Sequence, residues 1–381
     1  MPLNRLLLVL AAATAVVVAG AVAVAARGGS GATPPPKPLG TAIHDALTAP
    51  EATGVTARIS FTNKLFPSGA LTGQTGSALM TGASGRLWAN ANGGRLELQS
   101  DAGDVQITWN DTKVTVYDAS SNTAYVFDVP KDTQPQQAHT APTLDEISKF
   151  LTDAAAHWTI SAATPSNVAG QEAYTVSVSP KHDGGLLGSA ELAWDAIHGA
   201  PLEIAVYAQG SSSPVLALQA THISFGSVPQ SDVAVAPPAG AKIVDLSSQQ
   251  GSGTGSGSTP PVTGLPAVQA AAPFAVTAPD TLVGLPRQDI RLVGPADSRS
   301  VVAVYGQGLG AIVVVERATD TQNAKAGPLD QLPTVSLDGV TAHELSTQLG
   351  TILSWDKGGV STILAGSLPA AAAESAARAL K

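Results

Sequence analysis

The chain has 381 residues, a formal net charge of -9 and no cysteine, and 44% of its residues are hydrophobic against 13% charged. The acidic balance, without any run of basic residues, excludes nucleic acid as a partner, because binding to phosphates needs a basic surface. The absence of cysteine excludes disulfides, thiolate metal sites, a cysteine nucleophile and a lipidated N-terminal cysteine.

The N-terminus carries an uncharged, mostly apolar run from Leu6 to Ala26, with Arg5 before it and Arg27 after it. A basic residue, an apolar run and small residues near its end are typical of a secretory signal peptide. The run also approaches the roughly 20 residues that span a bilayer, which is typical of an uncleaved anchor. Residues 1–27 are therefore either a signal peptide or a membrane anchor. Both alternatives place the rest of the chain outside the cytoplasm, in the cell envelope or secreted.

Changes in composition divide the remainder. Residues 28–37 form a Pro/Gly spacer, and residues 247–278 form a Gly/Ser/Pro/Ala-rich linker. These segments leave a larger body, residues 38–246, and a smaller one, residues 279–381, both of ordinary domain size.

The larger body consists mainly of segments in which apolar and polar residues alternate, as they do in residues 55–61. This alternation predicts strands with one covered face. Only two helices are expected, over residues 38–49 and after the capping box Thr143–Glu146. A mostly β fold with so few helices predicts an antiparallel sheet that closes on itself or curls around a cavity that a helix covers. The further expected strands are residues 95–98, 105–109, 114–117, 124–127, 158–162, 173–178, 190–194, 202–207 and 215–225.

The smaller body is predicted to be a small α+β domain. A glycine-rich turn, Gly306–Gly310, lies between two apolar runs that read as strands, so no helix N-terminus follows it to bind a phosphate. Residues 352–355 and 360–364 are expected to form a hairpin, and residues 369–380 a closing helix. Residues 341–344 fit either a capping box or the start of a strand.

Catalytic and metal-binding signatures are absent from the sequence. The seven histidines have no metal-ligand spacing, no G-x-S-x-G elbow is present, and the carboxylate pairs lie in predicted turns or at a helix start. We therefore predict no catalytic residue, no metal site and no cofactor, and a binding protein rather than an enzyme.

Apolar side chains that point to the covered side of the predicted strands are the candidate ligand-binding residues. In a closed sandwich they would form the core, and in an open half-barrel some would line an apolar cavity; periodicity does not separate these alternatives. They are Ile59, Phe61, Leu96, Leu98, Ile107, Trp109, Val116, Phe127, Val176, Leu192, Ile204 and Val206.

Residues 164–180 (TPSNVAGQEAYTVSVSP), the Trp194-Asp195 pair and the following Gly199–Leu202 resemble the actinobacterial branch of the LolA-like and RseB-like lipoprotein-sorting superfamily. The resemblance covers most of residues 38–246. It implies a strongly curved antiparallel half-barrel sheet, helices that close its mouth and an interior that binds acyl chains. The smaller body also looks like the tail of such actinobacterial proteins.

This resemblance implies an extracytoplasmic carrier that binds a lipid or an acylated protein, associated with the membrane through its N-terminal segment or secreted. The alternative that it implies is an RseB-like regulatory sensor that contacts a membrane anti-sigma factor.

Overall fold

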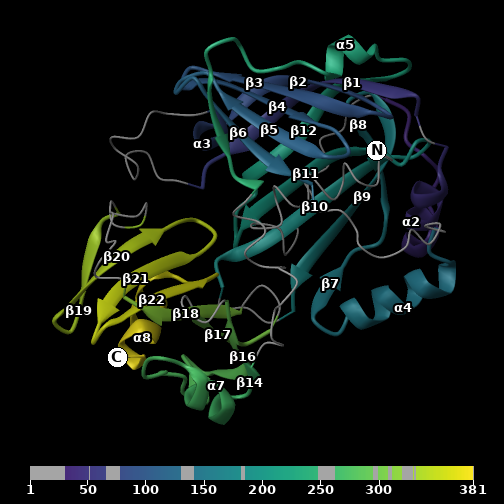
Figure 1. Ribbon diagram of the computed structural model, residues 1–381. Helices are drawn as coiled ribbons and strands as arrows, with labels where there is room; N and C mark the ends of the chain where they lie inside the picture. The colour runs from purple at the N-terminus through teal and green to yellow at the C-terminus, as the bar shows by residue number, and fades with distance from the viewer. Residues whose placement is uncertain are drawn as a thin grey trace. The chain divides into compact units, whose positions relative to one another are not determined.

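The structure is a computed structural model, and the chain divides in it into two compact units (Figure 1). The first unit comprises Met1–Lys64, Gly73–Lys181 and Gly188–Ser247, and the second comprises Leu65–Thr72, His182–Leu187 and Ser248–Lys381. The N-terminal apolar run lies outside the described residues, and no helix within those residues is long and apolar enough to cross a membrane. The described residues are 31–50, 52–65, 78–129, 141–181, 185–247, 262–294, 299–307, 311–319, 329 and 332–380.

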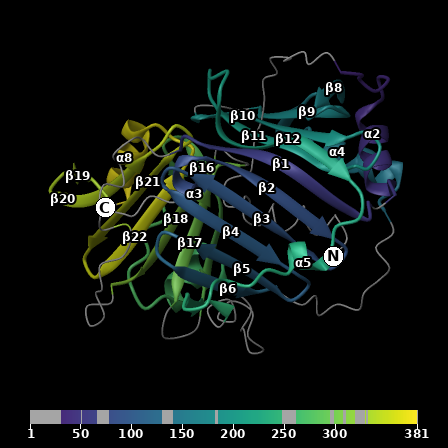
Figure 2. The ribbon, with the colours of Figure 1, turned by 90° about the horizontal axis from the view of Figure 1, so that it is seen from above.

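One 13-stranded sheet dominates the first unit (Figure 2). Its order is β13-β6-β5-β4-β3-β2-β1-β12-β11-β10-β9-β7, and β8 pairs with β9. The bounds are β1 (Gly54–Asn63), β2 (Ala83–Asn90), β3 (Gly93–Ser100), β4 (Gly103–Trp109), β5 (Lys113–Asp118), β6 (Thr123–Asp128), β7 (Trp158–Ile160), β8 (Thr164–Val168), β9 (Gln171–Pro180), β10 (Leu187–Asp195), β11 (Pro201–Ala208), β12 (Pro214–Phe225) and β13 (Lys242–Asp245).

Strands β1 to β6 form a meander, in which short turns join β2 to β6. In the turn before β5, the side-chain oxygen of Asn110 accepts hydrogen bonds from the backbone N–H groups of Thr112 and Lys113, each 2.9 Å long. In the next turn, Asp118 accepts in the same way from the N–H of Ser120. These are the turns that Asn and Asp favour, because their side chains replace a backbone acceptor. The prediction of a mostly β fold with a large curved antiparallel sheet is confirmed; the parallel pairing of β13 with β6 departs from it.

Four helices are described in the first unit: α2 (Leu39–Thr48), α3 (Ala78–Thr81), α4 (Leu144–Ala154) and α5 (Gln230–Val233). The predicted capping box of α4 is confirmed. The N–H of Glu146 donates to the hydroxyl of Thr143 at 3.3 Å, and the N–H of Thr143 donates to the Glu146 carboxylate at 2.8 Å. The Glu146 carboxylate also accepts from the Thr143 hydroxyl at 2.9 Å, and the two hydrogen bonds that it accepts from Thr143 hold the pKa of Glu146 below its usual value.

Residues 226–241, which connect β12 to β13, cross one face of the meander. Within this crossing segment, α5 packs against β2 and β3. The side-chain amide of Asn90 donates to the carbonyl of Val228 at 3.1 Å, and that of Asn122 donates to the carbonyl of Gly240 at 3.2 Å. The crossing segment therefore covers part of this face of the meander. It ends beside β6, where β13 becomes the edge strand of the sheet.

The second unit is built on a 9-stranded sheet of order β14-β16-β17-β18-β22-β21-β20-β19, with β15 paired to β16. The predicted α+β character, the strands on either side of the glycine-rich turn and the closing helix are all found. The bounds are β14 (Val262–Thr263), α7 (Leu265–Ala271), β15 (Thr281–Leu282), β16 (Leu285–Val293), β17 (Ser300–Tyr305), β18 (Ile312–Ala318), β19 (Thr334–Leu337), β20 (Val340–Ser346), β21 (Thr351–Lys357), β22 (Val360–Gly366) and α8 (Ala370–Ala379).

The boundary of this unit corrects the predicted linker of residues 247–278. Residues 262–271 form β14 and α7, and Val268 of α7 is completely buried in the core of the unit. Phe274 and Val276 pack against the same core. The Ala- and Pro-rich composition predicted a spacer. The segment is ordered because its few large apolar side chains are buried in the core, and this burial offsets the conformational entropy that ordering costs.

Candidate apolar binding face

A row of apolar side chains crosses β1 to β6. In an antiparallel sheet, directly paired residues present their side chains on the same face. Ala57 pairs with Leu87, Leu87 with Leu96, Leu96 with Ile107, Ile107 with Val116 and Val116 with Tyr125. The row therefore extends over six neighbouring strands on one face, which we call the apolar face.

The registers place ten of the twelve candidate residues on the apolar face. Ile204 of β11 joins it because it pairs with Leu218 of β12, which pairs with Phe61 of β1. Next to the row, Leu98, Trp109, Phe127 and Val206 each lie two residues along a strand from a member of the face, on the same side. The ten are Ile59, Phe61, Leu96, Leu98, Ile107, Trp109, Val116, Phe127, Ile204 and Val206.

Val176 and Leu192, the remaining two candidates, pair with each other on β9 and β10. They pack in a different cluster with Tyr174, Trp194 and Ala42 of α2. Helix α2 covers these two side chains, so the structure does not bring them together with the cluster on the meander.

The helix α3 covers the part of the apolar face on β1, β3 and β4. Ala78 of α3 is completely buried, and Leu79 packs beside it against the same cluster. Under this helix, Leu98 and Val105 keep only 2% of their surface exposed. This part of the face is a packed core in the structure.

Towards the edge of the sheet, the side chains of this face are less buried. On β5 and β6 the side chains of Val114, Val116 and Phe127 are half-buried, and Tyr125 is 36% exposed. The apolar face thus passes from a packed core under α3 to a partly open surface on β5 and β6. Alternation along the sequence identified Val116 and Phe127; Val114 and Tyr125 were missed, although their cross-strand partners would have pointed to them.

The opposite face of the meander is polar. The guanidinium of Arg95 lies 4.1 Å from the centre of the Trp88 ring and 3.3 Å, through Nε, from the carboxylate of Glu97. Gln106 of β4 donates to the carbonyl of Val235 in the crossing segment at 3.5 Å. Charged and amide side chains suit a surface that contacts water and the crossing segment. An apolar ligand on this surface would desolvate them, so the apolar face suits such a ligand better.

Two carboxyl groups on β10 and β11 lie close to each other. Burial, followed by the nearby charge of Glu203, raises the pKa of Glu191 to about 7, while a hydrogen bond with Tyr207 opposes the shift. Glu203 also accepts from the side-chain amide of Gln219 at 3.1 Å. A carboxyl pair of this kind can hold one proton near neutral pH. Among the described residues, no group of three or more possible ligands could hold a metal ion.

A buried aspartate and a half-buried histidine form a pair in the turn between β10 and β11. Asp195 is 1% exposed, and its Oδ1 accepts from the N–H groups of Ile197 and His198 and contacts His198 Nδ1 at 2.9 Å. The His198 ring stacks on Phe225 with the ring centres 3.9 Å apart. The carboxylate thus closes the turn with backbone donors, which gives this pair a structural explanation.

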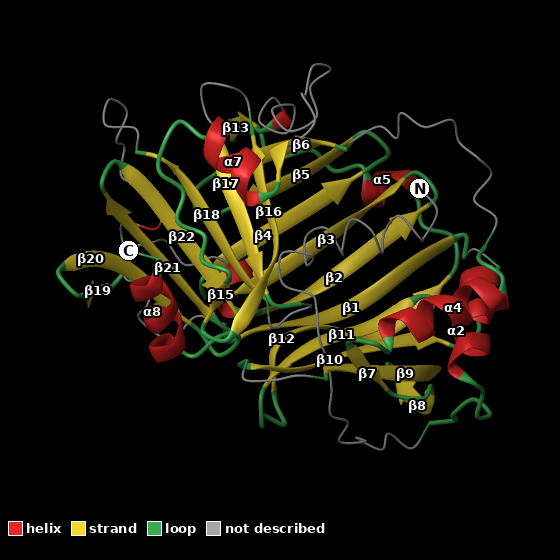
Figure 3. Ribbon diagram, turned by 90° about the horizontal axis from the view of Figure 1, so that it is seen from below, coloured by secondary structure: helices red, strands yellow, loops and turns green. Residues whose placement is uncertain are grey.

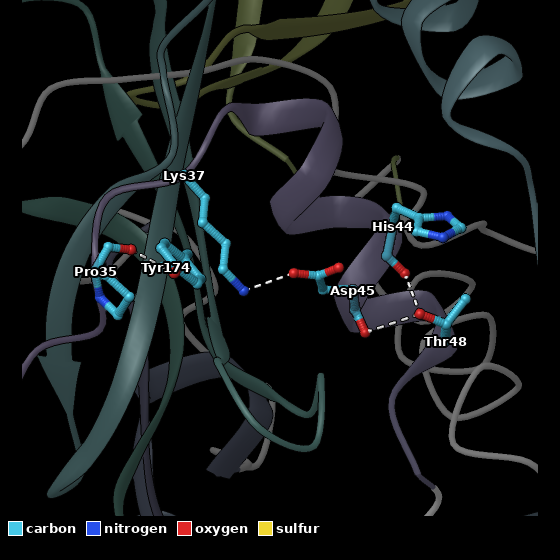
Figure 4. Close-up of polar contacts among 6 residues, drawn as sticks. All are labelled: Pro35, Lys37, His44, Asp45, Thr48 and Tyr174. Atoms are coloured by element: carbon cyan, nitrogen blue, oxygen red, sulfur yellow. Dashed lines mark hydrogen bonds and ion pairs between the residues drawn. The ribbon is translucent and has the colours of Figure 1, made fainter.

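The N-terminal segment of the described chain lies along β8 and β9. The amide of Asn167 donates to the carbonyl of Ala32 at 2.9 Å, and the hydroxyl of Tyr174 donates to that of Pro35 at 2.6 Å. The ammonium of Lys37 lies 2.6 Å from Asp45 of α2, which raises the pKa of the lysine (Figure 4). These contacts fix the point at which the chain enters the first unit.

Comparisons with known proteins give weak likenesses. No family model matches the chain, and no curated protein matches it. Among solved structures, MucB in complex with MucA(peri) is similar at 14% identity and a TM-score of 0.43, over 90% of this chain and 96% of that one. A putative outer membrane lipoprotein-sorting protein domain from Vibrio parahaemolyticus is similar at 10% identity and a TM-score of 0.20, over 51% of this chain and 94% of that one. Likenesses at these values do not by themselves assign a family or a function.

Proposed function

We propose that the chain is an extracytoplasmic protein that binds an acyl chain, carried by a lipid or a lipoprotein, against the apolar face and shields it from water. The observation that supports this most directly is the row of apolar side chains across six strands, with its β5–β6 end only partly covered. The sequence resemblance to lipoprotein-sorting proteins points to the same kind of ligand.

The energetics suit binding without catalysis. Burying one methylene group is worth about 0.8 kcal/mol, so ten methylenes against this face would contribute about 8 kcal/mol before the costs of association. The half-buried side chains of Val116 and Phe127 offer the first contacts. Helix α3 has four residues, too few for a helix that is stable by itself, so its place over β1, β3 and β4 depends on packing that an acyl chain could replace.

We further propose that the apolar run of residues 6–26 stays in place as a membrane anchor. Its length is near that of a bilayer-spanning helix, and it leads within a few residues to the segment that Asn167 and Tyr174 hold. The intact mass of the chain recovered from membranes of an actinobacterial host tests this: retention of the run supports the anchor, and its loss contradicts it.

The experiment for the binding function uses a fatty acid with a diazirine on its chain, added to the full-length protein in vesicles. After irradiation, cross-links are mapped by peptide mass spectrometry. Cross-links concentrated in residues 103–129 and reduced by unlabelled palmitate are expected. Their absence, or an even spread over both faces of the sheet, would contradict the proposal.

The second candidate function is a regulatory sensor that contacts a membrane anti-sigma factor. The sequence resemblance to RseB-like proteins favours it, and MucB, one of the similar structures, was solved with MucA(peri). A pull-down with the extracytoplasmic segments of the host's anti-sigma factors separates the two functions. Specific capture of an anti-sigma-factor segment, without acyl cross-linking, would favour the sensor function over the acyl-binding function.

A further inference from the structure

Helix α4 leaves much of its apolar surface without cover. Its one fully buried residue is Ile147, while Leu144 is 45% exposed and Phe150 is 68% exposed. It packs against α2, and Gly40 of α2 faces Ile147 and Leu151: a β-carbon at position 40 would lie about 4 Å from both, in ordinary van der Waals contact. Figure 3 shows α2 and α4 side by side at one end of the first unit.

A third exposed apolar side chain lies on another element that touches α2. Ile197, in the turn between β10 and β11, is 63% exposed. Gly199 of the same turn approaches the other half of α2 so closely that a β-carbon there would lie 2.2 Å from the carbonyl oxygen of Ala46. Large exposed apolar side chains are normal when single, but a group of them marks a surface that meets an apolar partner.

The chain enters the unit at this same end. The apolar run ends at Ala26, six residues before Ala32, whose carbonyl Asn167 holds. Even fully extended, six residues span only about 20 Å. The segment then passes Tyr174 and continues directly into α2, where Lys37 and Asp45 pair. With the run anchored, this short tether would keep the α2–α4 end close to the bilayer surface.

We propose that the first unit lies on the membrane through its α2–α4 end, with Leu144, Phe150 and Ile197 inserted at the bilayer interface. This inference rests on the proposed membrane anchor and goes beyond it by naming the surface. The occupant is the lipid interface itself, since the tether brings the bilayer within reach and the side chains are apolar. Helix α4 carries Asp145, Glu146 and Asp153 against Lys149, so insertion of apolar groups, without help from anionic lipid, drives the contact.

The absence of cysteine from the chain allows a direct test. Single cysteines are introduced by Lys149→Cys, next to Phe150, and by Ser212→Cys. Ser212 lies in the exposed turn after β11, at the opposite end of this strand from Gly199. Each full-length variant is labelled with an environment-sensitive fluorophore in phosphatidylcholine vesicles that contain lipids with a quencher at the top of the acyl chain. We expect at least threefold stronger quenching at position 149 than at position 212. Equal quenching would overturn the proposal.

Substitution of the exposed side chains provides the second arm. The double variant Leu144→Ser/Phe150→Ser is expected to reduce quenching at position 149 to the level of position 212. Ile243→Ser is the matched control, because Ile243 is 58% exposed on β13 at the β6 edge of the sheet, and it should leave quenching unchanged. Unchanged quenching in the double variant would also overturn the proposal.

The same vesicles are irradiated with the diazirine fatty acid, which separates this proposal from acyl binding. If the quenching difference is absent but the cross-links are retained, the docking proposal is contradicted and the acyl-binding proposal is not. A quenching difference without cross-links would contradict the acyl-binding function and leave docking supported.

Discussion

The indole ring of Trp109 on β4 lies over the backbone of Gly94, its direct partner on β3. A β-carbon at position 94 would lie 2.1 Å from Cζ2 of the indole, far closer than packed atoms approach. Trp109 is 8% exposed in this position and belongs to the cluster under α3. Because Gly94 has no side chain, the indole ring of Trp109, the largest residue of the apolar face, can lie against the backbone of β3.

The first prediction concerns this pair. Gly94→Ala forces the indole or the strand to move, and overpacking of a filled core costs about 1–3 kcal/mol. We expect the midpoint of urea unfolding, followed by near-ultraviolet circular dichroism, to fall accordingly. Gly226→Ala is the control, because a β-carbon there meets nothing within 4 Å, and it should leave the midpoint unchanged or slightly raised. Equal effects of the two changes would contradict the packing described.

The second prediction addresses the open end of the apolar face. Phe127→Asp places a charge where we expect the acyl chain, and it removes a phenyl ring whose complete burial under a bound chain would be worth about 1.5–3 kcal/mol. Binding of a fluorescent fatty acid should weaken at least tenfold. Thr115→Asp is the matched change on the opposite face of the neighbouring strand β5, where Thr115 is also half-buried, and it should preserve the affinity. Similar losses in both variants would argue against this face as the site.

The third prediction is a pH dependence in the second unit. Burial raises the pKa of Glu316 on β18 to about 7, while a hydrogen bond from the N–H of Thr277 opposes the shift. Because the folded pKa exceeds the unfolded value of 4.5, the stabilisation is complete below pH 4.5 and is lost as the pH rises through about 7. A shift of this size corresponds to about 3 kcal/mol.

Hydrogen exchange of the β18 amides, corrected for the intrinsic rate, measures this loss between pH 4.5 and pH 8. Glu316→Gln should remove most of the pH dependence, since the amide has no proton to release. Asp356→Asn changes an exposed carboxylate of the same unit and should keep the wild-type slope. An unaltered slope in Glu316→Gln would assign the dependence to another group.

The fourth prediction concerns the attachment of α4. Thr143→Ala removes the acceptor for the N–H of Glu146, and loss of an N-cap costs about 0.5–2 kcal/mol. We expect faster hydrogen exchange throughout α4. Thr152→Ala makes the same chemical change within the helix, where the hydroxyl only donates back to the carbonyl of Ser148, and should slow exchange or leave it unchanged. Faster exchange in Thr152→Ala alone would contradict the role of the cap.

Most strands of the first unit and their apolar side could be predicted because alternation along a strand specifies which residues share a side, but β2, β8 and β13 were missed. The turns at Gly93-Gly94, Asn110-Asp111 and Ser120–Asn122 were also predicted, and they join neighbouring strands between β2 and β6. Alternation does not specify what covers a face. The sequence therefore gave no sign that α2 would cover Val176 and Leu192, or that α3 would cover Leu98. The parallel position of β13 depends on the crossing segment, whose hydrogen bonds from Asn90 and Asn122 reach across more than a hundred residues.

The pairing of β1 with β12 has a consequence for how the protein forms. It joins residues 54–63 to residues 214–225, so the centre of the sheet closes only after most of the first unit is available. Such long-range pairing slows folding, and until then the edge of β1 is open to other chains. A nascent or truncated chain that ends before residue 214 would expose this edge together with the apolar face beside it. Because the N-terminal strands emerge long before their partner β12, incomplete molecules are prone to aggregate.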